Sequence, residues 1–141
     1  MADTASEPVL TSRYAEDTIA ELLLPHAAWH PYPTVDDRAA WDTLPGTVRS
    51  AYLEHGEEAL TSPWSQLLAT SYLEYARVGN RSRFQDLAFG RRGMLGSLVL
   101  AECIENKGRF LDQITNGIWL ICEESSWCIP AHVGVQRAGT G

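Results

Sequence analysis

The stretch Met94–Cys103, MLGSLVLAEC, is apolar on nearly every side of a helix. A helix with that pattern is buried between neighbours rather than laid on a surface. Helical spacing of apolar residues recurs on both sides of this stretch, and no alternating strand pattern accompanies it. A chain of 141 residues is long enough for a domain with its own core. The sequence therefore predicts an all-α protein built of helices joined by short turns.

Working outward, Lys107–Gly108 separates the central stretch from a helix over residues 109–122. We expect the inner side of that helix to be apolar, with Phe110, Ile114, Ile118 and Ile121 in the stripe and Trp119 and Leu120 widening it. Upstream, glycines predict a junction between two helical pieces at 90–93 and an interruption at Gly56. Ser62–Pro63 opens a helix that ends at Gly79–Asn80, and Thr47 is expected to cap the helix before it.

Nearer the N-terminus, residues 1–12 are small and polar and predict a flexible leader before a helical domain over 13–141. The segment 28–33 is expected to be extended, because proline disfavours helix in the residue before it. Thr34 with Asp37 resembles a capping box. Roughly six or seven short helices, some apolar on more than one side, favour an array of helical hairpins, such as an incomplete α/α toroid or a superhelix, over a compact four-helix bundle.

The net charge of -7 argues against a nucleic-acid partner, because phosphate binding needs a basic surface. We interpret the arginine-rich run 81–92 as the solvated side of a helix junction, with an anion site as the alternative. Residues 1–12 lack the pattern of a signal peptide, and no apolar run is long enough to span a bilayer. We therefore expect a cytoplasmic protein with no membrane partner.

Three cysteines, Cys103, Cys122 and Cys128, lie in apolar surroundings and are expected to be buried free thiols. Metal ligation and a disulfide are the alternatives, but His132 alone would not complete a zinc site with them. No P-loop, dinucleotide fingerprint or nucleophile elbow is present. We expect neither a metal nor a cofactor.

The residues that point to chemistry lie in the cluster Glu123–His132. Two adjacent carboxylates at a helix C-terminus are disfavoured by the helix dipole and need compensation from a bound sugar, an arginine or solvent. Trp127 beside carboxylates and His132 is typical of sugar sites, where the ring stacks on a pyranose. A second aromatic run, Trp29-His30-Pro31-Tyr32, either forms a cleft wall or pins the chain to the core.

The run 116–132, NGIWLICEESSWCIPAH, resembles the early helical region of heparinase II/III-type proteins. Upstream, Pro31–Pro33 and Asp37–Trp41 are similar to the N-terminal pattern of that family. The resemblance implies an N-terminal α/α toroid followed by a β-sandwich domain. It also implies a polysaccharide lyase that cleaves uronic-acid-containing chains by β-elimination.

The resemblance further implies roles for individual residues. His132 would help to neutralise the substrate carboxylate, Trp127 would stack on a sugar ring, and Glu124 would orient His132 or bind a hydroxyl, while Trp29 and His30 would also contact substrate. The main catalytic groups of the family lie further along the toroid, so this chain alone is expected to be inactive.

The expected partners are an acidic polysaccharide or oligosaccharide and a missing C-terminal part of the same protein, or a second copy, that covers the apolar last helices. A non-catalytic carbohydrate-binding module and a helical protein-interaction module are the alternatives.

Overall fold

The computed structural model describes residues 13–135, whose regular secondary structure is all helical, which confirms the all-α prediction. The described residues form six α-helices and two 3-10 helices, and no strand occurs among them. None of these helices is long and apolar enough to cross a membrane. The chain divides into two compact units, residues 1–33 and 34–141. The flexible leader expected over residues 1–12 lies outside the described part and stays a prediction.

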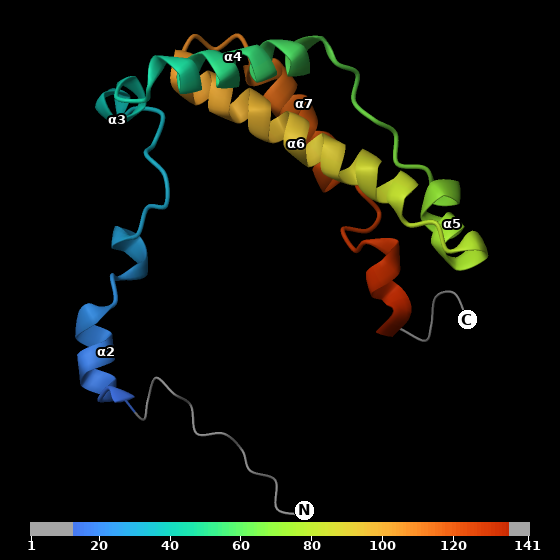
Figure 1. Ribbon diagram of the computed structural model, residues 1–141, viewed down its shortest axis with the longest axis horizontal. Helices are drawn as coiled ribbons and strands as arrows, with labels where there is room; N and C mark the ends of the chain where they lie inside the picture. Colours follow the sequence, from blue (N-terminus) through green and yellow to red (C-terminus); the bar gives the residue numbers. More distant parts are fainter. Residues whose placement is uncertain (1–12, 136–141) are drawn as a thin grey trace, which may run out of the picture. The chain divides into compact units, whose positions relative to one another are not determined.

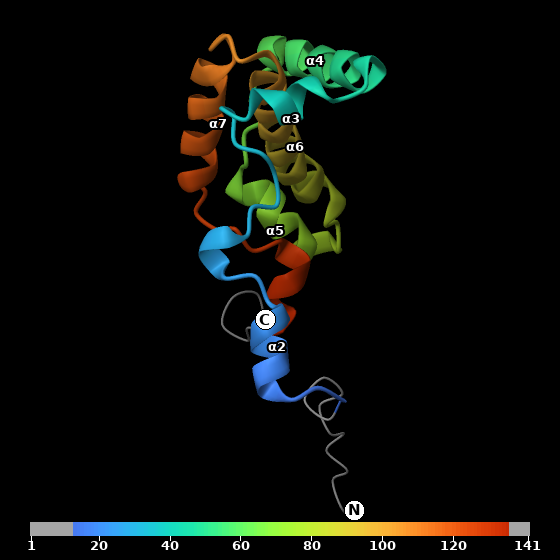
Figure 2. The ribbon, with the colours of Figure 1, turned by 90° about the vertical axis from the view of Figure 1, so that its left-hand side faces the viewer.

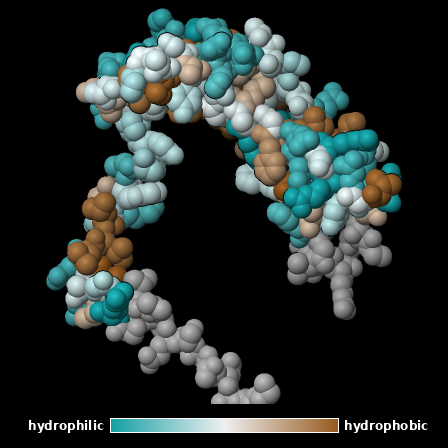
Figure 3. Space-filling view, in the orientation of Figure 1, coloured by the Kyte–Doolittle hydropathy of each residue, from teal (hydrophilic) through white to brown (hydrophobic). Residues whose placement is uncertain are grey.

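The first unit contains α2 (Glu16–Leu22) and the 3-10 helix η1 (His26–Ala28), the blue segments of Figure 1. Trp29 follows η1 in an extended conformation, with φ -91° and ψ 114°, as expected for the segment 28–33, but the expectation is wrong for Ala28, which belongs to η1. Leu22, Leu23 and Leu24 are all exposed. Figure 3 shows the resulting hydrophobic surface where α2 gives way to η1.

The core of the second unit is formed by α4 (Gly46–Thr61), α6 (Ser82–Glu105) and α7 (Leu111–Cys122). Helix α6 packs against both α4 and α7 (Figures 1 and 2). Leu98 and Ala101, from the central apolar stretch, are fully buried, as is Phe110 just before α7. The prediction that Met94–Cys103 is buried between neighbouring helices is confirmed for Leu98, Ala101 and Glu102, whereas Val99 is exposed and the other residues of the stretch are half-buried.

Three shorter elements complete this unit: α3 (Arg38–Asp42), α5 (Ala69–Val78) and the 3-10 helix η2 (Pro130–Val135). The N-cap of α3 is Asp37, whose carboxylate accepts from the Ala40 amide at 3.2 Å. Thr34 was the expected cap, but its backbone carbonyl instead accepts from the indole N–H of Trp41 at 2.9 Å. Helix α4 begins one residue before Thr47, so that Pro45 occupies its N-cap position.

The glycines expected to break helices do not do so. Helix α6 runs without interruption for 24 residues through Gly90 and Gly93, and α4 continues through Gly56. Each glycine costs a helix about 1 kcal/mol relative to alanine, and burial of the surrounding apolar residues offsets that cost. At Gly56 the missing side chain is required, because a Cβ there would collide with that of Ala101 and lie 3.2 Å from the Phe110 ring.

The helix expected from Ser62–Pro63 begins only at Ala69, and residues 63–68 are not helical. Tertiary contacts account for this difference. The Trp64 ring packs against Gly117, where an added Cβ would collide with the indole and also lie 3.2 Å from the Leu95 side chain. The Trp64 indole N–H also donates to the Gln113 side chain at 2.8 Å. Trp64 thus holds the extended segment 63–68 against α7. Local periodicity does not reveal this contact.

The inner stripe predicted for α7 is partly wrong. Phe110 is buried and Ile114 packs against the core, as expected, but Ile118 and Trp119 are exposed. Gly117 takes the buried position instead. A glycine there brings α7 close to Trp64, and this contact rotates the larger neighbouring side chains toward solvent.

The turn between α6 and α7 is held by two charged side chains. The buried Glu102 carboxylate accepts from the backbone amides of Gly108 at 2.6 Å and Phe110 at 3.2 Å. The Arg38 guanidinium donates to the Cys103 and Ile104 carbonyls at 2.6 and 2.8 Å, where α6 leaves its last carbonyls unpaired. Asn106, at φ 53°, ends the helix in the left-handed conformation.

On the surface of the same turn, Arg109 pairs with Glu57 of α4 and with Glu105 of α6. Hydrogen bonding to Arg109 lowers the pKa of both carboxyls. Because the Glu57 carboxyl is exposed, its pair with Arg109 contributes little to stability.

We expect Gly56→Ala to lower the free energy of unfolding by about 1–3 kcal/mol, because the added methyl overpacks the contact with Ala101. Gly90→Ala is the matched control, since a Cβ at that helical position meets nothing within 4 Å. It should raise the free energy of unfolding by about 0.5–1 kcal/mol. Urea unfolding followed by circular dichroism measures both. Equal effects of the two substitutions would contradict the close packing of α4 on α6.

Candidate functional site

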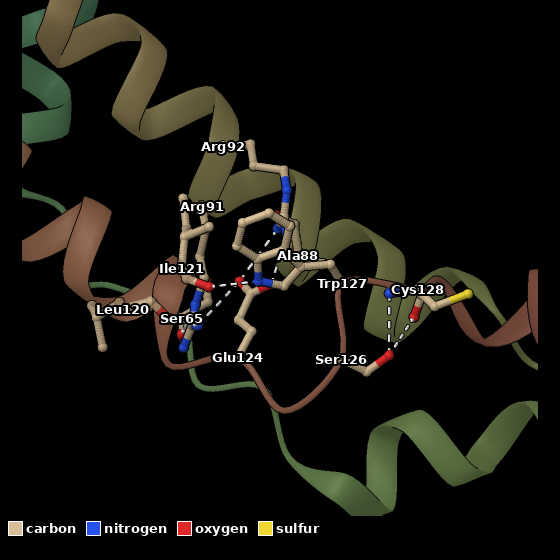
Figure 4. Close-up of polar contacts among 10 residues, drawn as sticks. All are labelled: Ser65, Ala88, Arg91, Arg92, Leu120, Ile121, Glu124, Ser126, Trp127 and Cys128. Atoms are coloured by element: carbon tan, nitrogen blue, oxygen red, sulfur yellow. Dashed lines mark hydrogen bonds and ion pairs between the residues drawn. The ribbon is translucent and has the colours of Figure 1, made fainter.

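The candidate site is organised by Glu124, in the loop that follows α7 (Figure 4). Its side chain is only 3% exposed and accepts hydrogen bonds from two arginines of α6. Arg92 donates at 2.7 Å to one carboxylate oxygen and at 3.3 Å to the other, while Arg91 donates at 3.4 Å. The arginine run was expected to be solvated, but the Arg91 side chain is 8% exposed, so that interpretation is wrong at this residue.

Arg91 also joins segments that are distant in sequence. Its Nε donates to the Ser65 carbonyl at 2.7 Å, and its Nη1 donates to the Leu120 carbonyl at 3.4 Å. The Leu120 carbonyl lies in the last turn of α7, where the helix dipole favours a cation. Arg91 and Arg92 therefore compensate Glu124 at the helix end. Of the alternatives that the sequence left open, an arginine is the compensation found.

Trp127 is presented by the same loop. Its indole N–H donates to the Ile121 carbonyl at 2.9 Å, yet the residue remains 66% exposed. In the same loop, the Ser126 hydroxyl accepts from the Cys128 amide at 3.1 Å, and this hydrogen bond orders the loop. Since the polar edge of the indole is fixed and most of its surface is free, the ring is suited to stacking on an apolar face of a ligand.

His132 lies in η2 and is exposed. Its backbone amide donates to the Ile129 carbonyl at 2.8 Å, which fixes the backbone. The suggested orientation of His132 by Glu124 has no counterpart here, because the hydrogen bonds of Glu124 with described side chains all go to arginines. The imidazole of His132 makes no hydrogen bond with another described side chain.

Trp29 and His30 belong to the first unit and are both exposed. The backbone of Trp29 closes η1 by donating its amide to the His26 carbonyl at 3.3 Å. Exposure of both side chains leaves them available to a ligand or a partner, so their proposed contact with substrate stays a prediction.

The cysteines are free thiols, but only Cys103 is partly buried. Burial raises its pKa. Cys122 and Cys128 are exposed, so the expectation of buried thiols is wrong for these two, which lie at the end of α7 and in the loop beyond it. Among residues 13–135, no three His, Cys, Asp or Glu side chains are grouped so that they could hold a metal ion.

Beside the ion pair lies a pocket of about 520 Å³ that the sequence did not predict. It is formed by residues from α5 and the segment before it, from α6, and from the end of α7 with the following loop: Leu67, Leu68, Ala69, Tyr72, Leu73, Phe84, Arg91, Leu120, Glu123, Glu124, Ser125 and Ser126. In the sequence, Tyr72 is indistinguishable from a residue of a core stripe. No local pattern identifies the pocket, because its walls meet only in the folded chain.

No protein-family model matches the chain, and no curated protein shows significant similarity to it.

We expect Glu124→Gln to destabilise the protein toward the lower end of about 3–5 kcal/mol, because it leaves the buried Arg91 charge without its counter-ion. Arg92 is half-buried and solvent reduces its share of the loss. Glu123→Gln is the control, since the neighbouring residue is exposed and should change stability by less than about 0.5 kcal/mol. Thermal unfolding of both variants distinguishes them. If Glu124→Gln proved as mild as its neighbour, the ion pair would not organise the loop.

Proposed function

We propose that the chain is the N-terminal helical portion of a heparinase II/III-like polysaccharide lyase, and that it binds uronic-acid-containing glycans through the loop 123–132. The observation that carries the proposal is Trp127, an exposed indole whose N–H is fixed to the Ile121 carbonyl on a loop anchored by Glu124. This loop is the part of the sequence in which the family resemblance is most specific.

The helical hairpins fit the same proposal at the level of the fold. Helices α6 and α7 pack together and are joined by the short turn 106–110, and α4 covers the other side of α6. Paired helices of this kind are the units of an α/α toroid, and we propose that these are its first hairpins. The exposed apolar residues Leu111, Ile118 and Trp119 on α7 are consistent with a further layer of helix at that side.

A lyase of this type must neutralise the uronate carboxylate, remove the C5 proton and protonate the leaving oxygen. His132 is the residue proposed for the carboxylate, because its exposed imidazole can donate a hydrogen bond and can carry a positive charge. Trp127 holds the sugar ring, and Glu124 is a positioning residue that acts through the arginines. The main base and acid are assigned to residues outside this chain, so binding without turnover is proposed for the chain itself.

We expect Trp127→Ala to weaken binding of a uronate oligosaccharide by about tenfold, since loss of one stacking ring removes roughly 1 kcal/mol or more. Isothermal titration calorimetry with a hyaluronan or alginate oligosaccharide measures the change. The matched control is Trp119→Ala, because Trp119 on α7 has the same exposure of 66%.

Equal losses in these two variants would contradict a specific sugar site at Trp127. The alternative function, a helical interaction module, is favoured by the exposed apolar side of α7. It predicts the reverse pattern. Trp119→Ala would weaken the association measured by light scattering, and neither variant would bind a glycan.

We expect His132→Ala in the longer, active protein to lower kcat for uronate polymers by more than about tenfold, because the substrate carboxylate loses a group that neutralises its charge. The ultraviolet absorbance of the unsaturated uronate product reports the rate. His55→Ala is the control, since His55 is also exposed but lies on α4. Unchanged turnover in the His132 variant would remove this residue from the mechanism.

A further inference from the structure

The pocket beside Glu124 has the size and composition of a ligand site. Its volume of about 520 Å³ lies within the roughly 300–1,000 Å³ that small-molecule sites occupy. Its walls come from three separate parts of the second unit, so the shape depends on tertiary packing rather than on one flexible loop. The proposed roles of Trp127 and His132 do not use it.

Most of the wall is apolar. Tyr72 and Phe84 pack edge to face, with ring centroids 5.0 Å apart, and give the pocket a rigid aromatic side. Leucines line the rest, and one of them, Leu68, is exposed. This apolar surface is concave and open to water. Covering it with an apolar group is favourable, because apolar area is removed from water.

The polar groups gather at one edge. Arg91 is paired with Glu124 there, and Glu124 is shared with Arg92, so neither buried group of the lining lacks a counter-ion. The Glu123 carboxylate, the other charged group of the lining, is exposed. Ser125 and Ser126 are exposed at the same edge and bear hydroxyls that suit a neutral polar group. A charged group buried against the apolar walls would lose its hydration. The part of the ligand that enters is therefore uncharged and apolar.

The polar edge is continuous with the proposed sugar site. Residues 123–126 line the pocket, and the next residue in the chain is Trp127. We propose that the pocket binds an alkyl, acyl or aryl substituent of a glycan whose sugar is held at Trp127, so that the ligand class is an amphipathic glycoside. The sugar half of this inference rests on the proposed function, whereas the apolar half rests on the pocket alone.

The test compares octyl β-D-glucuronide, below its micelle concentration, with methyl β-D-glucuronide by calorimetric titration. Burial of each methylene strengthens binding about fourfold, so the octyl compound should bind at least tenfold more tightly than the methyl compound. Ala69→Trp fills the pocket from an exposed lining position and should remove that preference. Ala76→Trp, at an exposed position of α5 that does not line the pocket, is the matched control and should retain it.

Leu68→Gln makes one wall of the pocket polar without a large change in side-chain size, and it should also reduce the octyl preference. It serves as a second test if the Ala69→Trp variant does not fold. Equal binding of the two glucuronides, or an octyl preference that survives Ala69→Trp, would overturn the inference. So would concentration-dependent dimerisation in sedimentation that Ala69→Trp abolishes while octyl binding is absent, because a second copy would then fill the pocket.

The two proposals fail in different ways. If Trp127→Ala leaves binding of uronate oligosaccharides unchanged while Ala69→Trp removes the octyl preference, the sugar site is wrong and the apolar pocket stands. If Trp127→Ala weakens the oligosaccharide and the octyl preference is absent from the start, the sugar site stands and the pocket has no apolar ligand.

Discussion

Around the candidate site, the structure of the second unit depends on the contact between Arg91 and Glu124. One guanidinium reaches the Ser65 carbonyl in the extended segment, the Leu120 carbonyl near the end of α7 and the Glu124 carboxylate in the loop beyond. A buried ion pair contributes little net stability when complete, but it is costly to break, because either partner left alone keeps its desolvation penalty. The main effect of the pair is therefore to fix where the three segments meet. Its net contribution to the stability of the protein is small.

Close approach of the helices is the second constraint. Gly56 lets α4 contact Ala101 of α6, and Gly117 lets Trp64 lie against α7. Both glycines occupy helical positions at which alanine would favour the helix itself. The free energy gained by packing outweighs this local preference, and it fixes which side of each helix is inward. Exposure of Trp119 is a consequence of the same geometry.

The chemistry available to the loop 123–132 follows from these constraints. The loop holds the Glu124 carboxylate against the arginines, fixes the Trp127 indole by its N–H and leaves the His132 imidazole exposed. The Glu124 carboxylate is not free to act as a general base, because both of its oxygens accept hydrogen bonds from arginines.

The sequence by itself determined the helical class, the burial of Leu98 and Ala101 within the central apolar stretch and the concentration of chemically distinctive residues after α7, because these depend on local periodicity and residue type. It misplaced the helix breaks at Gly56 and Gly90, the start of α5 and the solvation of Arg91. Only the tertiary structure decided these features, together with the pocket. Each depends on contacts between residues far apart in the chain, whose packing energy exceeds the local preferences that a sequence pattern records.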